Sequence, residues 1–422
     1  MLDQRALVNL LHQEADLAIG CTEPVMVAMA AARARQVLGV LPEQVEVVVS
    51  PAVWKNGRRV GLPGTRERGL DMAAAMGLLA PLEEGQRLLA FLEPGQITQA
   101  KKLVLEGAVK ARVLLNKEGL YTGVWARAGN NEVRVEMQDN HKNFSGVWKN
   151  GKLIDKPGEQ FNLSLKALLK QDYPSLLAAV LTLPGQEIDF LYQGARGIVI
   201  FAREVAEGIK VPGSSLSRFF RRAGAKTGAP AEQIRTLTGI AVAERMSGAV
   251  YPVLTSAGSG NQGILIAVPL FLVGEALETK RELLSRALAV AHYTNMYLRA
   301  YSGKLSPLCG AVTAGAGVAA AVSWLLGGSR QQMINAAQIL LGNLCCVLCD
   351  GAKENCSLKI STAAVEAVQA GQMAHLGINP EAGAGIIGKS LEDTLGLIKT
   401  VLQIGMDEVD YYLGKIDYLN LG

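Results

Sequence analysis

The feature that most constrains the fold is a nearly unbroken series of helical patterns after about residue 160. Apolar residues recur there at the three- and four-residue spacing of helices, and strand-like texture largely disappears. A mostly helical domain over residues 161–422 is therefore expected. Its helices are predicted at 186–208, 213–224, 230–247, 263–277, 279–300, 310–326, 329–345, 359–375 and 391–403.

Residues 41–160 have a different texture. β-rich runs separated by turn signals predict an antiparallel meander, and helical patterns lie around 67–79 and 97–106. Two helices within residues 1–40 are expected to pack on the helical domain, which makes 41–160 an inserted α+β domain. The predicted fold class is therefore α+β. The strands are expected at 45–50, 109–115, 121–128, 132–137 and 144–148.

Composition argues against several classes of function. The 422 residues include 42 Lys and Arg against 38 Asp and Glu, and the one basic cluster, 218–226, is typical of a solvated face and not of a nucleic-acid surface. The longest weakly charged stretches, 309–328 and 264–273, favour buried helices over membrane spans, and the first residues lack the apolar core of a signal peptide. We therefore expect a cytoplasmic protein without membrane or nucleic-acid partners. Homodimer formation is left open.

Six cysteines in a chain expected to stay in a reducing compartment favour metal binding or catalysis over disulfides. Cys309, Cys349 and Cys356 are three soft ligands with no obvious fourth partner, which suggests a metal centre with one open position. Their intervals match neither a ferredoxin nor a zinc finger, so zinc, an iron–sulfur cluster and plain thiols remain alternatives. Cys345 and Cys346 lie on an apolar helical pattern and are interpreted as small core residues.

Longer motifs around these cysteines resemble the iron–sulfur-dependent L-serine dehydratase and L-cysteine desulfidase family. The similar segments are Gly303-Lys304-Leu305-Ser306-Pro307-Leu308-Cys309-Gly310, residues 313–317, Cys349-Asp350-Gly351-Ala352-Lys353 with Cys356 and Lys359, and the Gly-rich loop 256–263. The resemblance covers essentially the whole chain. It implies that Cys309, Cys349 and Cys356 hold a [4Fe–4S] cluster whose fourth iron is open to a small amino-acid substrate.

One further motif distinguishes the two branches of this family. Gly20-Cys21-Thr22-Glu23-Pro24 is similar to the desulfidase branch, and no histidine of this chain lies in the Ser-Ser-His-Thr run of the serine dehydratases. The expected reaction is therefore non-redox β-elimination of L-cysteine to sulfide, ammonia and pyruvate. The nearest alternative is L-serine dehydration at the same cluster, and the alternative from another class is a non-catalytic protein that senses or stores metal.

Cys21 is the candidate acid/base residue for this chemistry. Pro24 favours a helix start, so Cys21 is expected just outside a helix N-terminus, which would depress its pKa and let the thiolate take the Cα proton. The alternative is a small residue that fills a corner between helices. Glu23 is either a first-turn carboxylate favoured by the helix dipole or a group that orients the substrate ammonium.

Three kinds of segment supply candidates for substrate binding. The Gly-rich loop 256–263 precedes an apolar helix, where backbone N–H groups can meet an anion, although a plain loop with a helix cap has the same pattern. Two lysines near the predicted ligands would bind a carboxylate or balance the cluster, unless they are simply exposed. Turns at 55–57 and 139–143 are candidates for a lid over the site, with proton transfer by a histidine, but the pattern at 55–57 favours a plain surface turn. Besides Glu23, the candidates are Asn56, His141, Asn143, Asn261, Gln262, Lys304 and Lys359.

Overall fold

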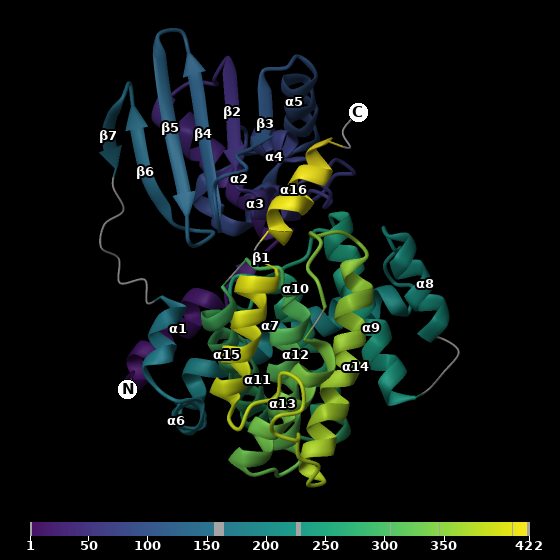
Figure 1. Cartoon of the computed structure of the whole chain (residues 1–422). Helices are drawn as coiled ribbons and strands as arrows, with labels where there is room; N and C mark the ends of the chain where they lie inside the picture. Colours follow the sequence, from purple (N-terminus) through teal and green to yellow (C-terminus); the bar gives the residue numbers. More distant parts are fainter. Residues whose placement is uncertain are drawn as a thin grey trace.

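The computed structural model describes residues 2–155, 164–224, 229–303, 305–345, 347–406 and 408–419. In this part of the chain, a six-stranded sheet with its covering helices forms one layer and a body of helices forms the other (Figure 1). Each layer has its own hydrophobic core. The predicted α+β class, with a large helical part and a smaller sheet, is confirmed.

The sheet is mixed, with strand order β3-β2-β4-β5-β6-β7. The predicted antiparallel meander is confirmed for β4 to β6, but it is wrong for β3, which does not neighbour β4 and instead pairs parallel with β2. The chain between β2 and β3 passes through four helices, which give the long crossover that parallel neighbours require. The strands are β2 (Gln44–Val49), β3 (Val109–Val113), β4 (Tyr121–Ala128), β5 (Asn131–Gln138), β6 (Phe144–Lys149) and β7 (Lys152–Asp155).

One face of the sheet is covered by α2 (Thr22–Leu38) and α4 (Leu70–Gly77), with η1 (Leu82–Phe91) and α5 (Pro94–Leu105) beside them. The expectation placed α2 on the helical domain. Its residues from Val25 to Ala32 are instead all buried in the core of the sheet layer, because a helix apolar on every side needs partners all round. Cys21, the residue just before α2, belongs instead to the core of the helical layer, so α2 begins at the junction of the two layers.

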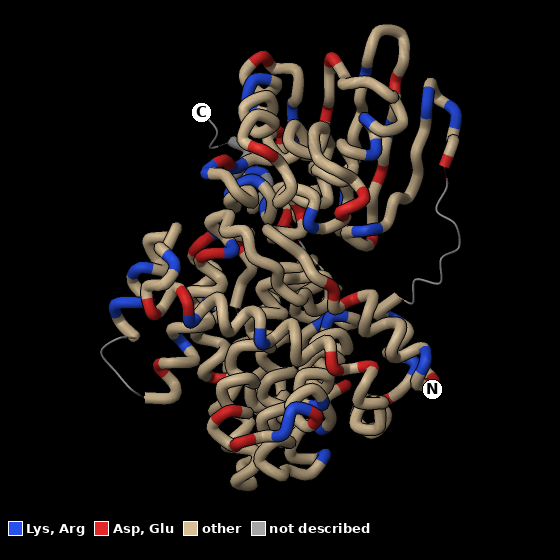
Figure 2. The backbone as a smooth tube through the Cα atoms, turned by 180° about the vertical axis from the view of Figure 1, so that it is seen from behind, with Lys and Arg blue, Asp and Glu red and all other residues tan. Residues whose placement is uncertain are grey.

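The helical layer is built around α12 (Gly310–Leu325), in which every residue from Ala311 to Ser323 is buried. Figure 2 shows few charged residues on the central helices of this layer, which agrees with the Gly- and Ala-rich sequence. The predicted helices are all present. They are α7 (Gly185–Ala206), α8 (Ser215–Gly224), α9 (Pro230–Ser247), α10 (Gly260–Ala276), α11 (Arg281–Ser302), α12, α13 (Arg330–Leu344), α14 (Cys356–His375) and α15 (Leu391–Thr400).

Several shorter elements complete the helical layer. The helix α1 (Gln4–Glu14) packs into it, as expected. Two short strands pair antiparallel beside it. Among the described residues, no helix is both long enough and apolar enough to cross a bilayer. Besides α1, the shorter elements of this layer are β1 (Leu17–Ala18), β8 (Val253–Leu254), η2 (Leu165–Lys170), α6 (Tyr173–Val180) and η3 (Val401–Gly405).

Two helices join the layers. The segment 55–57, expected as an exposed turn, is instead the last turn of α3 (Pro51–Gly57), and all seven residues of this helix are buried. Its N-cap residue Ser50 accepts a hydrogen bond from the Val53 N–H, which explains why a helix starts there. The C-terminal helix α16 (Val409–Leu419) leaves the helical layer and packs against α3 (Figure 1).

Candidate active site

A buried cavity of about 90 Å³ lies where the two layers meet. Its walls come from segments far apart in sequence: the start of α2, the end of α3, the loop after β5, the end of α9, the loop before α10, the end of α11, and the segments that precede α12 and α14. Polar and thiol groups therefore converge on one cavity. They are Cys21, Thr22, Glu23, Lys55, Asn56, His141, Arg245, Ser259, Asn261, Gln262, Arg299, Ser306, Cys309, Cys349 and Cys356.

The three predicted ligand cysteines all line this cavity. An isolated antiparallel bridge between Leu308 and Leu348 places two of them on neighbouring segments. The Cys309 N–H donates to the Val347 carbonyl at 2.9 Å, and the Cys349 N–H donates to the Pro307 carbonyl at 2.7 Å. Cys309 is also the N-cap of α12, and Cys356 is the first residue of α14. Two helix N-termini, which favour negative charge, thus point toward the thiols.

The thiols influence one another's ionisation. Burial, followed by the charge of Cys349, raises the pKa of Cys309 to about 12. Burial, with a further contribution from Cys349, raises the pKa of Cys356 to about 11. Three thiolates lining one cavity would need a positive partner, and the irons of a cluster would supply it.

These cysteines fit a cluster that spreads its ligands over several irons. Among the described residues, no three His, Cys, Asp or Glu side chains are grouped closely enough to share one metal ion. A [4Fe–4S] cluster attaches each thiolate to a different iron, so it does not require that shared sphere. Cys309, Cys349 and Cys356 are the residues that would hold it.

Three lysines hold the loop around Cys349 in place. Lys359, predicted to bind substrate, does not line the cavity; its ammonium donates to the Leu348 carbonyl at 2.8 Å and to Asp350 at 2.6 Å. Lys353 also pairs with Asp350, at 2.6 Å. On the other side, the buried ammonium of Lys55 donates to the Cys349 carbonyl at 3.0 Å.

Cys21, the N-cap of α2, belongs to a second buried group centred on Glu23. The Cys21 thiol donates to Glu23 Oε2 at 3.1 Å, and the Asn56 side-chain amide donates to Glu23 Oε1 at 3.2 Å. His141 Nε2 lies 3.8 Å from Glu23 Oε1. Asn56 Oδ1 and His141 Nε2 are buried without a hydrogen-bond partner, so polar groups remain available to a ligand in this cavity.

The electrostatics of this group correct one expectation. Burial and then the negative charge of Glu23 raise the pKa of Cys21 well above its ordinary value, although the charge of Arg245 opposes the shift. The predicted depression at the helix N-terminus is therefore wrong for the free site, because burial and the neighbouring carboxylate outweigh the helix dipole. Burial also opposes ionisation of Glu23, but the neighbouring His141 lowers the pKa of this carboxyl to about 2.

The Gly-rich loop supplies two further candidates. Asn261 Oδ1 accepts a hydrogen bond from Arg245 at 2.9 Å, and Gln262 Oε1 accepts one from the buried Asn295 at 2.9 Å. Arg299 also lines the cavity, and its Nη1 donates to Ser306 at 3.4 Å.

Sequence reasoning missed Lys55, Arg245, Asn295 and Arg299. The available signal was a charged or amide side chain inside a helical stretch that is otherwise buried on all sides.

Some predicted residues lie elsewhere. Asn143 does not line the cavity; its side-chain amide donates to the Gln138 carbonyl at 3.2 Å within the loop after β5. Lys304 and Cys346 lie outside the described residues. Cys345 is the C-cap of α13 and is half-buried.

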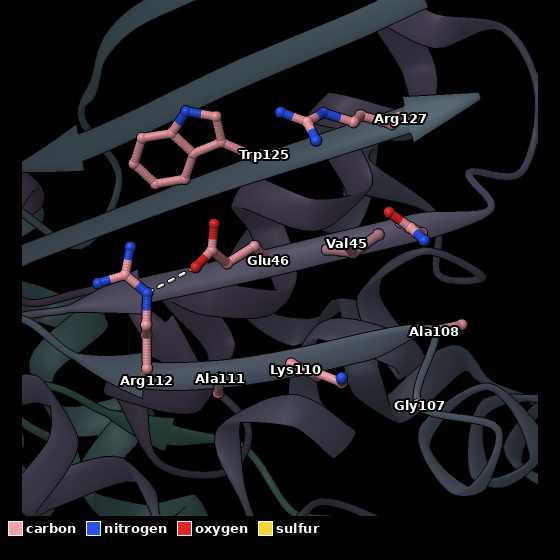
Figure 3. Close-up of a pocket in the computed structure, with 10 residues that line it drawn as sticks. Val45, Glu46, Gly107, Ala108, Lys110, Ala111, Arg112, Trp125 and Arg127 are labelled. Atoms are coloured by element: carbon pink, nitrogen blue, oxygen red, sulfur yellow. Dashed lines mark hydrogen bonds and ion pairs between the residues drawn. The ribbon is translucent and has the colours of Figure 1, made fainter. Parts of the chain in front are cut away.

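A larger hollow of about 440 Å³ lies on the open face of the sheet, over β2, β3 and β4 (Figure 3). Glu46 pairs there with Arg112 at 2.5 Å, and both side chains are about half exposed. Neither cysteine nor histidine is among the residues that line it. The interlayer cavity is therefore the better candidate for catalysis.

Comparison with known sequences defines the family. The family model of the serine dehydratase alpha chain matches residues 165–413, which span most of the helical layer and all three cysteines of the 309–356 region that line the cavity. The chain therefore belongs to the serine dehydratase alpha chain family, and its helical part is a domain of that type.

Relatives resemble the chain over its whole length. A UPF0597 protein of Moorella thermoacetica is 64% identical over 419 residues, which cover 99% of each chain. A UPF0597 protein of Methanocella arvoryzae is 33% identical over 97% of each chain. One of Aeromonas hydrophila is also 33% identical, over 96% of this chain and 93% of the relative. The similarity thus extends beyond the dehydratase domain to the sheet layer.

Proposed function

We propose that this protein is a lyase that converts L-cysteine and water to pyruvate, ammonia and hydrogen sulfide, at a [4Fe–4S] cluster held by Cys309, Cys349 and Cys356. The observation that carries the proposal is the convergence of these three thiols with the Cys21–Glu23 pair in one buried cavity. Bound there, a cluster with an open iron would act as a Lewis acid toward the leaving sulfur. The protein's own residues would bind the amino acid, exclude water and move the proton.

In this proposal, Cys21 is the residue that removes the Cα proton of the substrate. In the free site its thiol is held protonated by burial and by the charge of Glu23. A substrate ammonium beside Glu23 would neutralise that charge and so remove one cause of the raised Cys21 pKa. The Cys21 proton passes through Glu23 to the His141 ring, and the thiolate then takes the Cα proton. The C–H electron pair forms the Cα–Cβ double bond, and the Cβ–S bond breaks with its electrons on sulfur.

The second candidate is the dehydration of L-serine. The match to the serine dehydratase alpha chain favours it, since the helical layer is of that type. The same proton path would serve either substrate, because both share the Cα–H bond, the ammonium and the carboxylate. The difference lies in the leaving group, sulfide or water. The segment Gly20-Cys21-Thr22-Glu23-Pro24, which resembles the desulfidase branch, favours cysteine.

The test uses full-length protein prepared without oxygen and assayed with both amino acids. We expect bound iron and inorganic sulfide, and release of sulfide, ammonia and pyruvate from L-cysteine. Cys349→Ser should lose iron, colour and activity, while the matched variant Cys345→Ser, in a residue outside the cavity lining, should keep all three. Cys21→Ser should keep the iron and lose turnover by about 10²-fold or more.

Three other outcomes would contradict this proposal. Formation of pyruvate from L-serine but not from L-cysteine would show that the reaction is dehydration. Bound iron without ammonia from either amino acid, together with indifference to Cys21→Ser, would favour a non-catalytic metal-binding protein. A colourless, iron-free protein after preparation without oxygen would show that these cysteines do not hold a cluster.

A further inference from the structure

Arg245 is a buried cation without an anionic partner. Its residue is only 3% exposed on α9. Nη1 donates to the Asn261 side-chain oxygen at 2.9 Å, Nη2 donates to the Gly20 carbonyl at 2.6 Å, and Nε is buried with no acceptor. Both acceptors are neutral, and none of the described Asp or Glu side chains forms an ion pair with this guanidinium. Because an unpaired buried charge is strongly unfavourable, such a group implies an anion that is supplied from outside the chain.

The N-terminus of α10 lies against the same guanidinium. A Cβ placed on Gly260, the first residue of this helix, would lie only 2.5 Å from Arg245 Cζ, so glycine allows the close approach. The N-cap Ser259 makes no side-chain hydrogen bond to the first turn, whose N–H groups have no partner within the helix. The positive end of a helix and a buried cation therefore meet at one wall of the cavity.

Another wall of the cavity has the opposite character. Glu23 and Asn56, both less than a tenth exposed, line it, and Asn56 Oδ1 has no donor. Carboxylate and amide oxygens are acceptors suited to an ammonium group. The cavity thus combines an anion-binding wall, a cation-binding wall and the three thiols, which matches the three functional groups of an α-amino acid with a reactive β-substituent.

We propose that Arg245, with the first turn of α10, binds the α-carboxylate of the substrate, and that Glu23 and Asn56 bind its α-ammonium. The assignment rests on the proposed function in taking the ligand to be an α-amino acid. It makes Arg245 a specificity-determining residue: amines without a carboxylate would lack their main anchor. Lys359, by contrast, is committed to the loop around Cys349.

Two small thiols separate the two walls experimentally. 3-Mercaptopropionate has the carboxylate and thiol of cysteine without the ammonium, and cysteamine has the ammonium and thiol without the carboxylate. Their binding to full-length protein prepared without oxygen is measured by calorimetry, which requires no turnover. Arg245→Gln should weaken 3-mercaptopropionate about 30-fold and change cysteamine less than about threefold. Asn56→Leu should show the reverse preference.

Arg245→Lys keeps the charge but loses the two-pronged geometry, so it should restore part of the affinity for 3-mercaptopropionate, to within about tenfold of the original. It also carries the test if Arg245→Gln fails to fold, which thermal unfolding would reveal. Unchanged 3-mercaptopropionate affinity in both Arg245 variants, or an equal loss for both ligands, would overturn the inference.

The inference and the proposed function fail separately. A carboxylate preference lost in Arg245→Gln, in a protein that eliminates neither sulfide nor water, would uphold this binding site and reject the reaction. Turnover of L-cysteine with an unchanged KM in Arg245→Gln would reject the site and uphold the reaction. A fall in kcat with unchanged carboxylate binding would assign Arg245 to Cys21 ionisation instead, and would also overturn the inference.

Discussion

At the scale of single residues, Glu23 organises one half of the candidate site. The carboxylate accepts hydrogen bonds from Cys21, Thr22 and Asn56 and lies beside His141. No other described side chain of the cavity joins so many of its polar groups. Its negative charge both holds the Cys21 proton and offers a place for an ammonium, so its removal should affect proton transfer and binding together.

Glu23→Gln should lower kcat by about 10²-fold or more and raise KM for L-cysteine, because the amide can neither relay the Cys21 proton nor pair with an ammonium. Thr22→Val, which removes only one of the donors to Glu23, is the matched control and should change kcat less than about fivefold. Steady-state kinetics with sulfide detection measures both. A Glu23→Gln enzyme with full activity would contradict this role.

A second residue gives a prediction about stability. His292 is buried in α11, and burial lowers its pKa to about 3. Between about pH 6.5 and about pH 3, this histidine binds a proton in the unfolded chain but not in the folded protein. The free energy of unfolding therefore falls by about 1.4 kcal/mol per pH unit as the pH decreases. His292→Leu should remove this part of the acid sensitivity.

Denaturant unfolding at several pH values between 7 and 4 measures the slope. His12→Leu is the control, since the His12 side chain is 49% exposed. Parallel pH profiles for the original protein and His292→Leu would refute the assignment.

At the scale of elements, small residues let the helices of the helical layer approach one another closely. A Cβ on Gly317 of α12 would lie 2.4 Å from the Ala291 carbonyl oxygen of α11, whereas one on Gly197 of α7 would meet nothing within 4 Å. Both are glycines within helices, so intrinsic helix propensity favours alanine equally at the two positions. Only packing distinguishes them.

Gly317→Ala should therefore destabilise the protein by about 2 kcal/mol, since two buried helices must separate. Gly197→Ala should stabilise it by about 0.5–1 kcal/mol. Thermal or denaturant unfolding compares the two variants. An equal effect at both positions would mean that the α11–α12 contact is not as close as described.

Most helices could be predicted from the sequence because apolar residues recur at helical spacing in each of them, whether one face or several faces are buried. The sequence did not reveal α3, since Lys55-Asn56-Gly57 has the local chemistry of a turn and only tertiary contacts bury it. Nor did it reveal the parallel β2–β3 pair, whose register depends on the crossover. The cysteines of the site could be predicted from motifs, but Arg245 could not, because a charge at one position of an apolar helix does not indicate which cavity it faces.

At the scale of the whole molecule, α16 fastens the two layers. Asp410 of this helix pairs with the buried Lys55 ammonium at 2.5 Å, and Lys55 also donates to the Cys349 carbonyl. One lysine thus connects α3 of the sheet layer, the cysteine loop of the helical layer and the C-terminal helix. The charges of Cys349 and Asp410 raise the pKa of Lys55, although burial opposes the shift.

Asp410→Asn should cost about 3 kcal/mol of stability, because it leaves a buried ammonium without its counter-charge. Glu408→Gln, at the exposed residue just before this helix, is the control and should change stability by less than about 0.5 kcal/mol. Unfolding curves give the difference, and iron content after brief exposure to air reports whether the cysteine loop has loosened. Equal stabilities for the two variants would show that the pair does not hold the layers.

The walls of the cavity begin at Cys21, and the helix that secures them includes Asp410. The segments from Cys21 to Asp410 must therefore all be synthesised before the pocket can close around its cysteine sulfurs. If the proposed cluster is held there, its iron would be delivered after synthesis, and a product that ends before Asp410 would leave the cavity thiols without the contact of α16.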